Sequence, residues 1–255
     1  MKHYEGYLID LDGTMYRGKE RIDEAVDFVK ELVKRNIPYL FVTNNSSKTC
    51  AQVADHLSEM GIPATDDQVF TTSLATAQYI AEEKQDAKIY MIGEEGLRDA
   101  LEKQGFTIQD DDVDYVIMGI DRDITYEKLA KACLAVRAGA KFISTNGDIA
   151  LPTERGFMPG NGSLTSVVAV STETAPIFIG KPESIIVNQA LEVIGTPREK
   201  TVMVGDNYQT DIMAGINAKM DTIMVHTGVT SKEQLTTYTK QPTFSIHSLS
   251  EWKFV

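Results

Sequence analysis

The sequence contains few cysteines and no long apolar run. Cys50 and Cys133 are the only cysteines among its 255 residues. Two scattered thiols indicate neither a disulfide framework nor a zinc site, so we expect a reducing, cytoplasmic environment. The first residues lead directly into an apolar segment without a signal-peptide pattern. No apolar run approaches the ~18 residues that span a bilayer, so we expect no membrane partner.

Positive charge is also scarce. Lys and Arg total 25 against 37 Asp and Glu, which gives a net charge of −12. Such a surface repels phosphate backbones, so nucleic acid is not an expected partner. It also repels small phosphate esters, so a protein of this composition that binds one needs a local cation or metal ion.

Short apolar segments alternate with segments of helical periodicity along the whole chain, which is long enough for one or two domains. The expected strands are residues 7–9, 38–42, 88–92, 115–118, 142–144, 177–179, 201–204 and 222–225. The expected helices are residues 22–33, 48–60, 74–83, 94–104, 126–137, 164–170, 183–194 and 211–217. This order predicts an α/β fold in which parallel, doubly buried strands are covered by helices on both faces.

Polar residues follow four of the expected strands. They are Asp10 and Asp12, then Thr43 and Asn44, then Lys181, and then Asp206 with Asp211 five residues later. Ligand sites of open α/β sheets form beyond the carboxyl ends of the strands, so we expect these side chains to gather there.

Their chemistry suits a phosphate ester. Carboxylates at Asp10 and Asp206 would repel one another unless a cation lay between them, and oxygen ligands suit Mg²⁺. Thr43, Asn44 and Lys181 supply hydrogen-bond donors and positive charge for phosphate oxygens.

The two acids of the first segment suggest covalent catalysis. Asp10 and Asp12 lie two residues apart, so in an extended chain their side chains share one side, and Gly13 permits a sharp turn after them. One carboxylate can then attack phosphorus and form an aspartyl-phosphate, while the other transfers a proton.

These motifs together resemble the haloacid dehalogenase (HAD) superfamily of phosphatases. Asp10-Leu11-Asp12-Gly13-Thr14 resembles its first motif, Thr43 the second, Lys181 the third, and Gly205-Asp206 with Asp211 the fourth. The resemblance implies a Rossmann-like core, Asp10 as the nucleophile and Asp12 as the general acid and base. It also implies Mg²⁺ held by Asp10, the backbone carbonyl of Asp12, Asp206 and, through water, Asp211. Thr43 and Asn44 would hold the transferring group, and Lys181 would offset its charge.

Further stretches resemble the NagD-like subfamily of sugar phosphatases and 4-nitrophenylphosphatase-like proteins. They are Thr43-Asn44-Asn45-Ser46, Thr145-Asn146-x-Asp148 and Pro159-Gly160-x-Gly162-Ser163-Leu164. The resemblance implies an α/β cap of class IIA over residues 84–175, inserted into a core of residues 1–83 and 176–255. We expect the cap segment from Asn146 through Asp148 to Met158 to contact the leaving group. Gly147 and Asn161 stand where the subfamily pattern has Pro and Ala.

The expected function is therefore a Mg²⁺-dependent phosphatase for small phosphorylated metabolites, either sugar phosphates or nucleotides. A phosphotransferase or mutase remains an alternative, because the same residues would pass the phosphoryl group to a sugar. A phosphate-accepting signalling module is a second alternative, although such modules are shorter and lack a cap. The sequence also permits a homodimer through an edge strand of the cap.

Overall fold

The computed structural model describes residues 2–254, which form two compact units. The first unit comprises residues 2–43, 51–70 and 181–254, and the second comprises residues 44–50 and 71–180. The sequence placed the boundaries of the insertion at residues 84 and 175. The contacts group residues 44–50, 71–83 and 176–180 with the second unit as well.

The first unit is built on a parallel sheet. Within residues 2–254 this sheet has six strands, in the order β15-β14-β13-β1-β4-β5. The strands are β1 (Gly6–Ile9), β4 (Tyr39–Thr43), β5 (Val69–Thr71), β13 (Thr201–Gly205), β14 (Asp221–Val225) and β15 (Phe244–Ile246). Every residue of β1, β4 and β13 is buried. Their continuous apolar character therefore reflects packing on both faces of the sheet.

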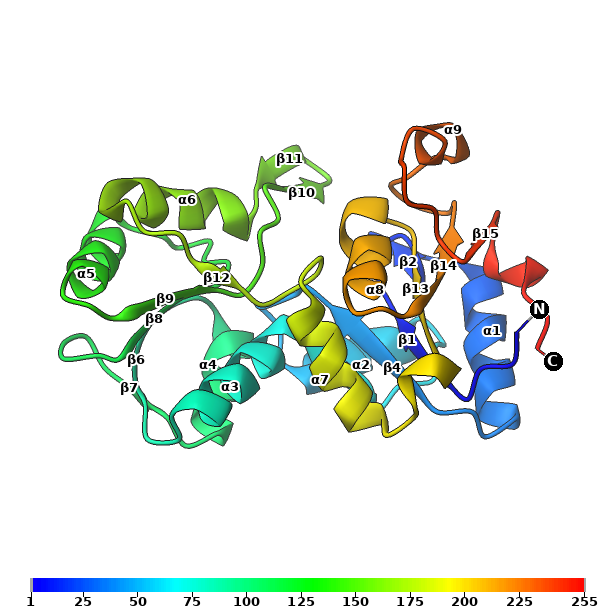
Figure 1. Ribbon diagram of the computed structural model, residues 1–255, viewed down its shortest axis with the longest axis horizontal. Coiled ribbons are helices and arrows are strands. Elements are labelled where there is room, and N and C mark those ends of the chain that lie inside the picture. Colours follow the sequence, from blue (N-terminus) through cyan, green and yellow to red (C-terminus); the bar gives the residue numbers. More distant parts are fainter. Residues whose placement is uncertain (1, 255) are drawn as a thin grey trace. The chain divides into compact units, whose positions relative to one another are not determined.

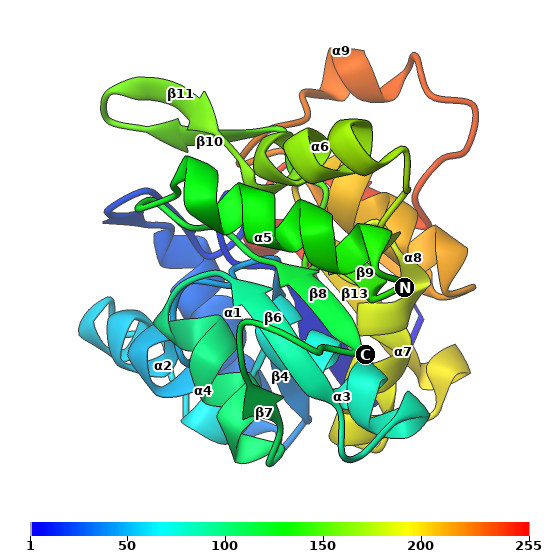
Figure 2. The ribbon, with the colours of Figure 1, turned by 90° about the vertical axis from the view of Figure 1, so that its left-hand side faces the viewer.

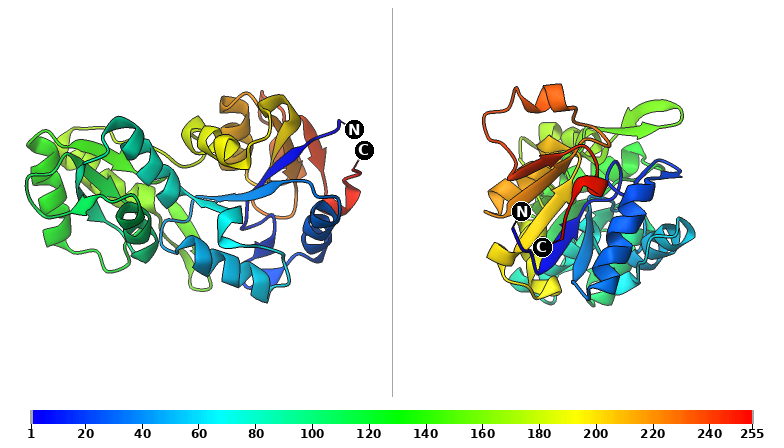
Figure 3. Two further views of the ribbon diagram at one scale, coloured as in Figure 1. Left: turned by 90° about the horizontal axis from the view of Figure 1, so that it is seen from below. Right: turned by 90° about the vertical axis from the view of Figure 1, so that its right-hand side faces the viewer.

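Helices cover both faces of this sheet. Helices α7 and α8 lie on one face, and α1 and α2 lie on the other (Figures 1 and 3). The helices of the first unit are α1 (Asp23–Lys34), α2 (Cys50–Glu59), α7 (Ser184–Ile194), α8 (Met213–Asn217) and α9 (Lys232–Leu235). Helix α1 buries Ala25, Val26, Val29 and Leu32, which recur at helical spacing and so form one apolar face.

Short elements complete the first unit. They are the strands β2 (Tyr16–Arg17) and β3 (Glu20–Arg21), the 3₁₀ helices η1 (Asp66–Gln68), η2 (Arg198–Lys200) and η4 (Leu249–Glu251), and the π-helix η3 (Tyr208–Ile212). The sequence predicted one helix over residues 211–217. The structure instead has the π-helix η3, which leads directly into α8.

The second unit has its own parallel sheet, with five strands among the described residues in the order β12-β9-β8-β6-β7. The strands are β6 (Lys88–Ile92), β7 (Thr107–Ile108), β8 (Tyr115–Met118), β9 (Lys141–Ser144) and β12 (Ile177–Phe178). Its helices are α3 (Thr72–Glu83), α4 (Glu95–Lys103), α5 (Tyr126–Arg137) and α6 (Asn161–Thr172). Helices α5 and α6 cover one face of this sheet (Figure 2). There Val136 and Val168 join a core with Val116 and Phe142.

A hairpin of β10 (Ala150–Thr153) and β11 (Gly156–Pro159) connects β9 to α6. The sequence did not predict it, because its residues are largely exposed and show no regular alternation of apolar side chains. The parallel sheets confirm the predicted α/β class with a Rossmann-like core. None of the helices within residues 2–254 has the length and apolar character needed to cross a membrane.

Candidate active site

The carboxyl ends of β1, β4 and β13 meet at one edge of the first sheet. Ile9, the last residue of β1, pairs with Val204 of β13 and with Phe41 of β4. The backbone amide of Asp10 donates to the carbonyl of Val204 at 2.9 Å, and Asp206 follows directly after β13. Strands β4 and β5 lie on one side of β1, and β13, β14 and β15 lie on the other, so the strand order reverses at β1. Open parallel sheets bind ligands at such a reversal.

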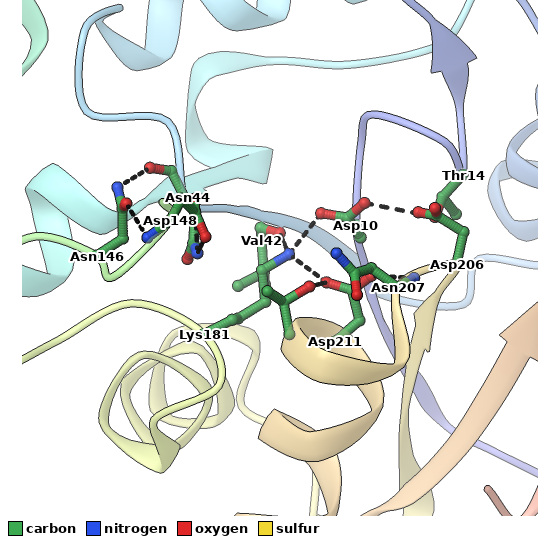
Figure 4. A network of polar contacts seen from close by, with 11 residues as sticks. Asp10, Thr14, Val42, Asn44, Asn146, Asp148, Lys181, Asp206, Asn207 and Asp211 are labelled. Carbon is green, nitrogen blue, oxygen red and sulfur yellow. Dashed lines mark hydrogen bonds and ion pairs between the residues drawn. The ribbon is translucent and has the colours of Figure 1, made fainter. Parts of the chain in front are cut away.

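Lys181 supplies a buried positive charge at this edge. Its side chain is 2% exposed, and its Nζ lies 2.5 Å from Asp10 Oδ1 and 2.8 Å from Asp211 Oδ1. Nζ also donates to the carbonyl of Val42 at 2.9 Å (Figure 4). Burial alone lowers the pKa of Lys181, but the carboxylates of Asp10 and Asp211 more than offset it, so the pKa is raised. The ammonium group therefore stays charged inside the protein.

Asp206 and Asp211 are held by hydrogen-bond donors. Oδ1 of Asp206 accepts from Thr14 Oγ1 at 3.1 Å, and its Oδ2 accepts from the amide of Val229 at 2.6 Å. Oδ2 of Asp211 accepts from the amide of Asn207 at 3.0 Å. Asp211 belongs to η3, and π-helical turns often occur at functional sites. Both carboxylates are thus oriented by the fold itself.

Two glycines have no side chain where the carboxylate of Asp206 lies. Gly13 has a φ of +90°, and a Cβ there would lie 2.3 Å from Asp206 Oδ2. A Cβ at Gly228 would lie 2.0 Å from the same oxygen. A side chain at either position would therefore displace the carboxylate.

Asp10, Asp206 and Asp211 form a buried cluster of three carboxylates, which have oxygens within 4.8 Å of one another. Lys181 compensates one of the charges, so a fully ionised cluster keeps two in excess. Burial and Asp211 raise the pKa of Asp10 well above its usual range, although Lys181 opposes the rise. Burial and Asp211 also raise the pKa of Asp206 to about 7. Uncompensated buried charge is costly, and oxygen donors of this kind fit a divalent metal ion.

The other two predicted residues of the first unit differ in exposure. Asp12 is exposed, and its side chain is not part of the carboxylate cluster. Its Oδ1 lies 3.4 Å from the amide of Gly18. Thr43 is buried as the last residue of β4. The roles predicted for them, proton transfer and phosphate binding, stay predictions.

Asn44, Asn146 and Asp148 form a hydrogen-bonded cluster within the second unit (Figure 4). Nδ2 of Asn44 donates to Asp148, with both carboxylate oxygens at 3.3 Å. Nδ2 of Asn146 donates to the backbone carbonyl of Asn44 at 2.8 Å, and its Oδ1 accepts from the amide of Asp148 at 3.1 Å. The structure therefore brings together three residues that the sequence assigned to substrate binding, and it groups Asn44 with the second unit although the sequence placed it in the core.

Several contributors to these clusters were not identified from the sequence. Thr14 lies inside the first motif but had no assigned role, although a hydroxyl next to two acids was a usable signal. The amide of Val229 and the carbonyl of Val42 are backbone groups, which carry no signal in the side-chain pattern. Asn161 binds the turn at Asn146 and is described below.

The family models match both arms of the first unit. A haloacid dehalogenase-like hydrolase model matches residues 7–107, and a HAD-hydrolase-like model matches residues 178–252. Together they cover more than half of the chain.

Relatives that match nearly the whole chain are named as a nucleotidase or as phosphatases. The chain is 64% identical over 252 residues to the 5′-nucleotidase YutF of Bacillus subtilis, with 99% of this chain and 98% of the relative covered. It is 56% identical over 252 residues to an acid sugar phosphatase of Staphylococcus saprophyticus, with 98% and 97% covered. The crystal structure of a single mutant of a thermostable NPPase from Geobacillus stearothermophilus superimposes with a TM-score of 0.95 at 60% identity, covering 100% of both chains.

The names of these relatives, the parallel fold and the buried acids at the edge of the first sheet all indicate the same family. The chain belongs to the haloacid dehalogenase-like hydrolases, among the NagD-like phosphatases, and is a phosphoric monoester hydrolase.

Proposed function

We propose that the chain hydrolyses small phosphomonoesters with Mg²⁺, through an aspartyl-phosphate on Asp10. The observation that carries the proposal is the buried carboxylate cluster, in which Lys181 compensates only one of three charges. Asp10, Asp206 and Asp211 would hold the ion, together with the backbone carbonyl of Asp12. When bound, Mg²⁺ supplies charge neutralisation for the cluster and for the phosphate oxygens.

The residues of the chain account for both halves of the reaction. A carboxylate oxygen of Asp10 bonds to phosphorus while the bond from phosphorus to the ester oxygen breaks, and Asp12 protonates that oxygen. Water then attacks phosphorus and gives a proton to Asp12, and the bond between Asp10 and phosphorus breaks to release phosphate. Asp12 is exposed, which suits a group that exchanges protons with solvent. Lys181, at 2.5 Å from Asp10, favours the ionised nucleophile.

Asp148 supports a leaving group that carries hydroxyl groups. A carboxylate only accepts hydrogen bonds, so it repels a phosphate and binds hydroxyl donors. Asp148 is half-buried and oriented by Asn44 and Asn146. The relatives named a 5′-nucleotidase and an acid sugar phosphatase have names that denote phosphates of hydroxyl-bearing molecules. We assign Asp148 to the leaving group, and Thr43 and Asn44 to the phosphoryl group.

The test is hydrolysis of p-nitrophenyl phosphate with Mg²⁺ and after chelation. We expect release of phosphate to water only with the metal, whereas transfer to an added sugar would indicate a phosphotransferase. Asp10→Asn should lower kcat by about 10⁴-fold or more, as removal of a nucleophile does in other covalent enzymes. Asp27→Asn, an exposed change of the same kind on α1, is the matched control. Equal activity of the two variants would exclude Asp10 as the nucleophile.

A further inference from the structure

Asn161 opens helix α6 inside the second unit, and its side chain is almost completely buried. Its Nδ2 lies within hydrogen-bond distance of four oxygens. They are the carbonyl of Met118 at 3.1 Å, Ser144 Oγ at 3.0 Å, Thr145 Oγ1 at 3.1 Å and the carbonyl of Asn146 at 3.0 Å. The amide group thus ties the start of α6 to the ends of β8 and β9.

The turn that Asn161 contacts is the one that carries Asp148. The carbonyl of Asn146 accepts from Asn161, and the side chain of Asn146 accepts from the amide of Asp148. The amide of Gly162 donates to the carbonyl of Asp148 at 2.9 Å. A Cβ at Gly160 would lie 2.1 Å from that carbonyl oxygen. The turn and the first turn of α6 are therefore packed backbone to backbone.

One atom of the Asn161 side chain opposes folding. Its Oδ1 is buried without a hydrogen-bond partner among residues 2–254, and such a carbonyl opposes folding. Alanine would begin the helix equally well, because the preceding Gly160 is the N-cap and the Asn161 side chain does not cap the helix. The contribution of Asn161 therefore comes from its Nδ2, which contacts the ends of β8 and β9 and the turn at Asn146.

The geometry points to Asn161 as a positioning residue for leaving-group recognition, an inference that rests on the proposed function. Its amide holds the turn at Asn146 so that the carboxylate of Asp148 faces a hydroxyl group of the leaving group. Asn161 itself does not touch the substrate. Substrates whose leaving group has no hydroxyl group do not use this contact.

The test compares Asn161→Ala with wild type on two substrates. One is p-nitrophenyl phosphate, and the other is a sugar phosphate or nucleoside monophosphate that the wild type hydrolyses. The variant should lose about tenfold or more in kcat/KM for the hydroxyl-bearing substrate, because a hydrogen bond to a charged group contributes at least that factor. For p-nitrophenyl phosphate kcat/KM should change less than about threefold, since no such bond exists. Both assays are run at a temperature at which the variant stays folded, because a loss of stability alone would lower kcat/KM on both substrates equally.

A double-mutant cycle tests whether Asn161 affects substrate selectivity through Asp148. Asp148→Ala should reproduce the selective loss, and adding Asn161→Ala to it should change kcat/KM little further. Ser166→Ala is the control on the same helix, because Ser166 is exposed and its hydroxyl donates within α6. Equal loss on both substrates, or additive losses in the double variant, would overturn the inference. A wild type that fails to hydrolyse p-nitrophenyl phosphate with Mg²⁺ would instead contradict the proposed function.

Discussion

Without a divalent cation, the stability of the protein should depend on pH through Asp206. Its side chain is completely buried, and its pKa is raised from 3.8 to about 7 by burial and by the charge of Asp211. The hydrogen bonds from Val229 and Thr14 oppose this rise without cancelling it. In the unfolded chain the same carboxyl group titrates at about 3.9.

The size and sign of the effect follow from these two values. They differ by about three pH units, which corresponds to about 4 kcal/mol at about 1.4 kcal/mol per unit. Because the pKa is higher in the folded protein, the folded protein keeps a proton that the unfolded chain has released. The contribution of Asp206 is therefore complete below about pH 4 and is lost as the pH rises to about 7. About 4 kcal/mol is a large share of the roughly 5–15 kcal/mol typical of folded proteins.

The assay compares wild type with Asp206→Asn, which keeps an uncharged side chain of similar shape at every pH. Urea unfolding of both metal-free proteins between about pH 4 and about pH 8 gives the difference in unfolding free energy, in which groups outside the carboxylate cluster cancel. The wild type should lose about 4 kcal/mol relative to the variant across this range. At about pH 8, Mg²⁺ at about 100 times its Kd should restore about 2.7 kcal/mol to the wild type and much less to the variant.

Two results would refute this reasoning. A constant difference between wild type and Asp206→Asn across the range would show that Asp206 titrates at its ordinary value. The burial argument for the metal site would then fail. Equal stabilisation of both proteins by Mg²⁺ would show that Asp206 does not hold the ion.

Three further changes test individual contacts of the site. Lys181→Met should lower the unfolding free energy of the metal-free protein by about 3–5 kcal/mol, because Asp10 and Asp211 lose the cation that pairs with both of them. Urea unfolding measures the loss, and a change below about 1 kcal/mol would contradict the pairing. Gly13→Ala should abolish turnover in steady-state assays, because the added Cβ would lie 2.3 Å from Asp206 Oδ2 and the φ of Gly13 is +90°. Gly18→Ala is the control for backbone strain, because Gly18 also has a positive φ of +58° but nothing lies within 4 Å of the added Cβ. Full activity of Gly13→Ala would show that the position of Asp206 does not matter. Asp12→Asn should slow release of phosphate more than release of p-nitrophenol, a good leaving group, so rapid mixing should show a burst; absence of a burst would argue against Asp12 as the base of the second step.

Much of the first sheet could be predicted from the sequence because its strands are buried on both faces. Residues such as those of β1 and β13 form short apolar runs that few other structures would accommodate. Acids placed directly after such runs must lie at the sheet edge, so Asp10 and Asp206 could be predicted to lie together. Lys181 follows the expected strand at residues 177–179, but that strand, β12, pairs with β9 in the sheet of the second unit. The position of Lys181 beside Asp10 therefore does not follow from the strand rule.

The remainder depends on chain segments that meet only after folding. Residues 71–83 join the second unit through buried Thr72 and Ser73, and polar residues in a helix do not mark a domain boundary. Val229 reaches Asp206 through its backbone, which has no side-chain signature. Asn161 is remote in sequence from Met118, whose carbonyl it binds, and no local pattern links them.

The most direct test of the central claim is to trap the phosphorylated enzyme and locate the phosphoryl group. Wild type and Asp12→Asn are mixed with p-nitrophenyl phosphate and Mg²⁺, quenched in acid and reduced with borohydride, which converts an aspartyl-phosphate to homoserine. Peptide mass spectrometry should then find homoserine at position 10, more of it in Asp12→Asn, and none when Mg²⁺ is omitted. Turnover with unmodified Asp10 in both proteins, or with the modification at another residue, would contradict the account.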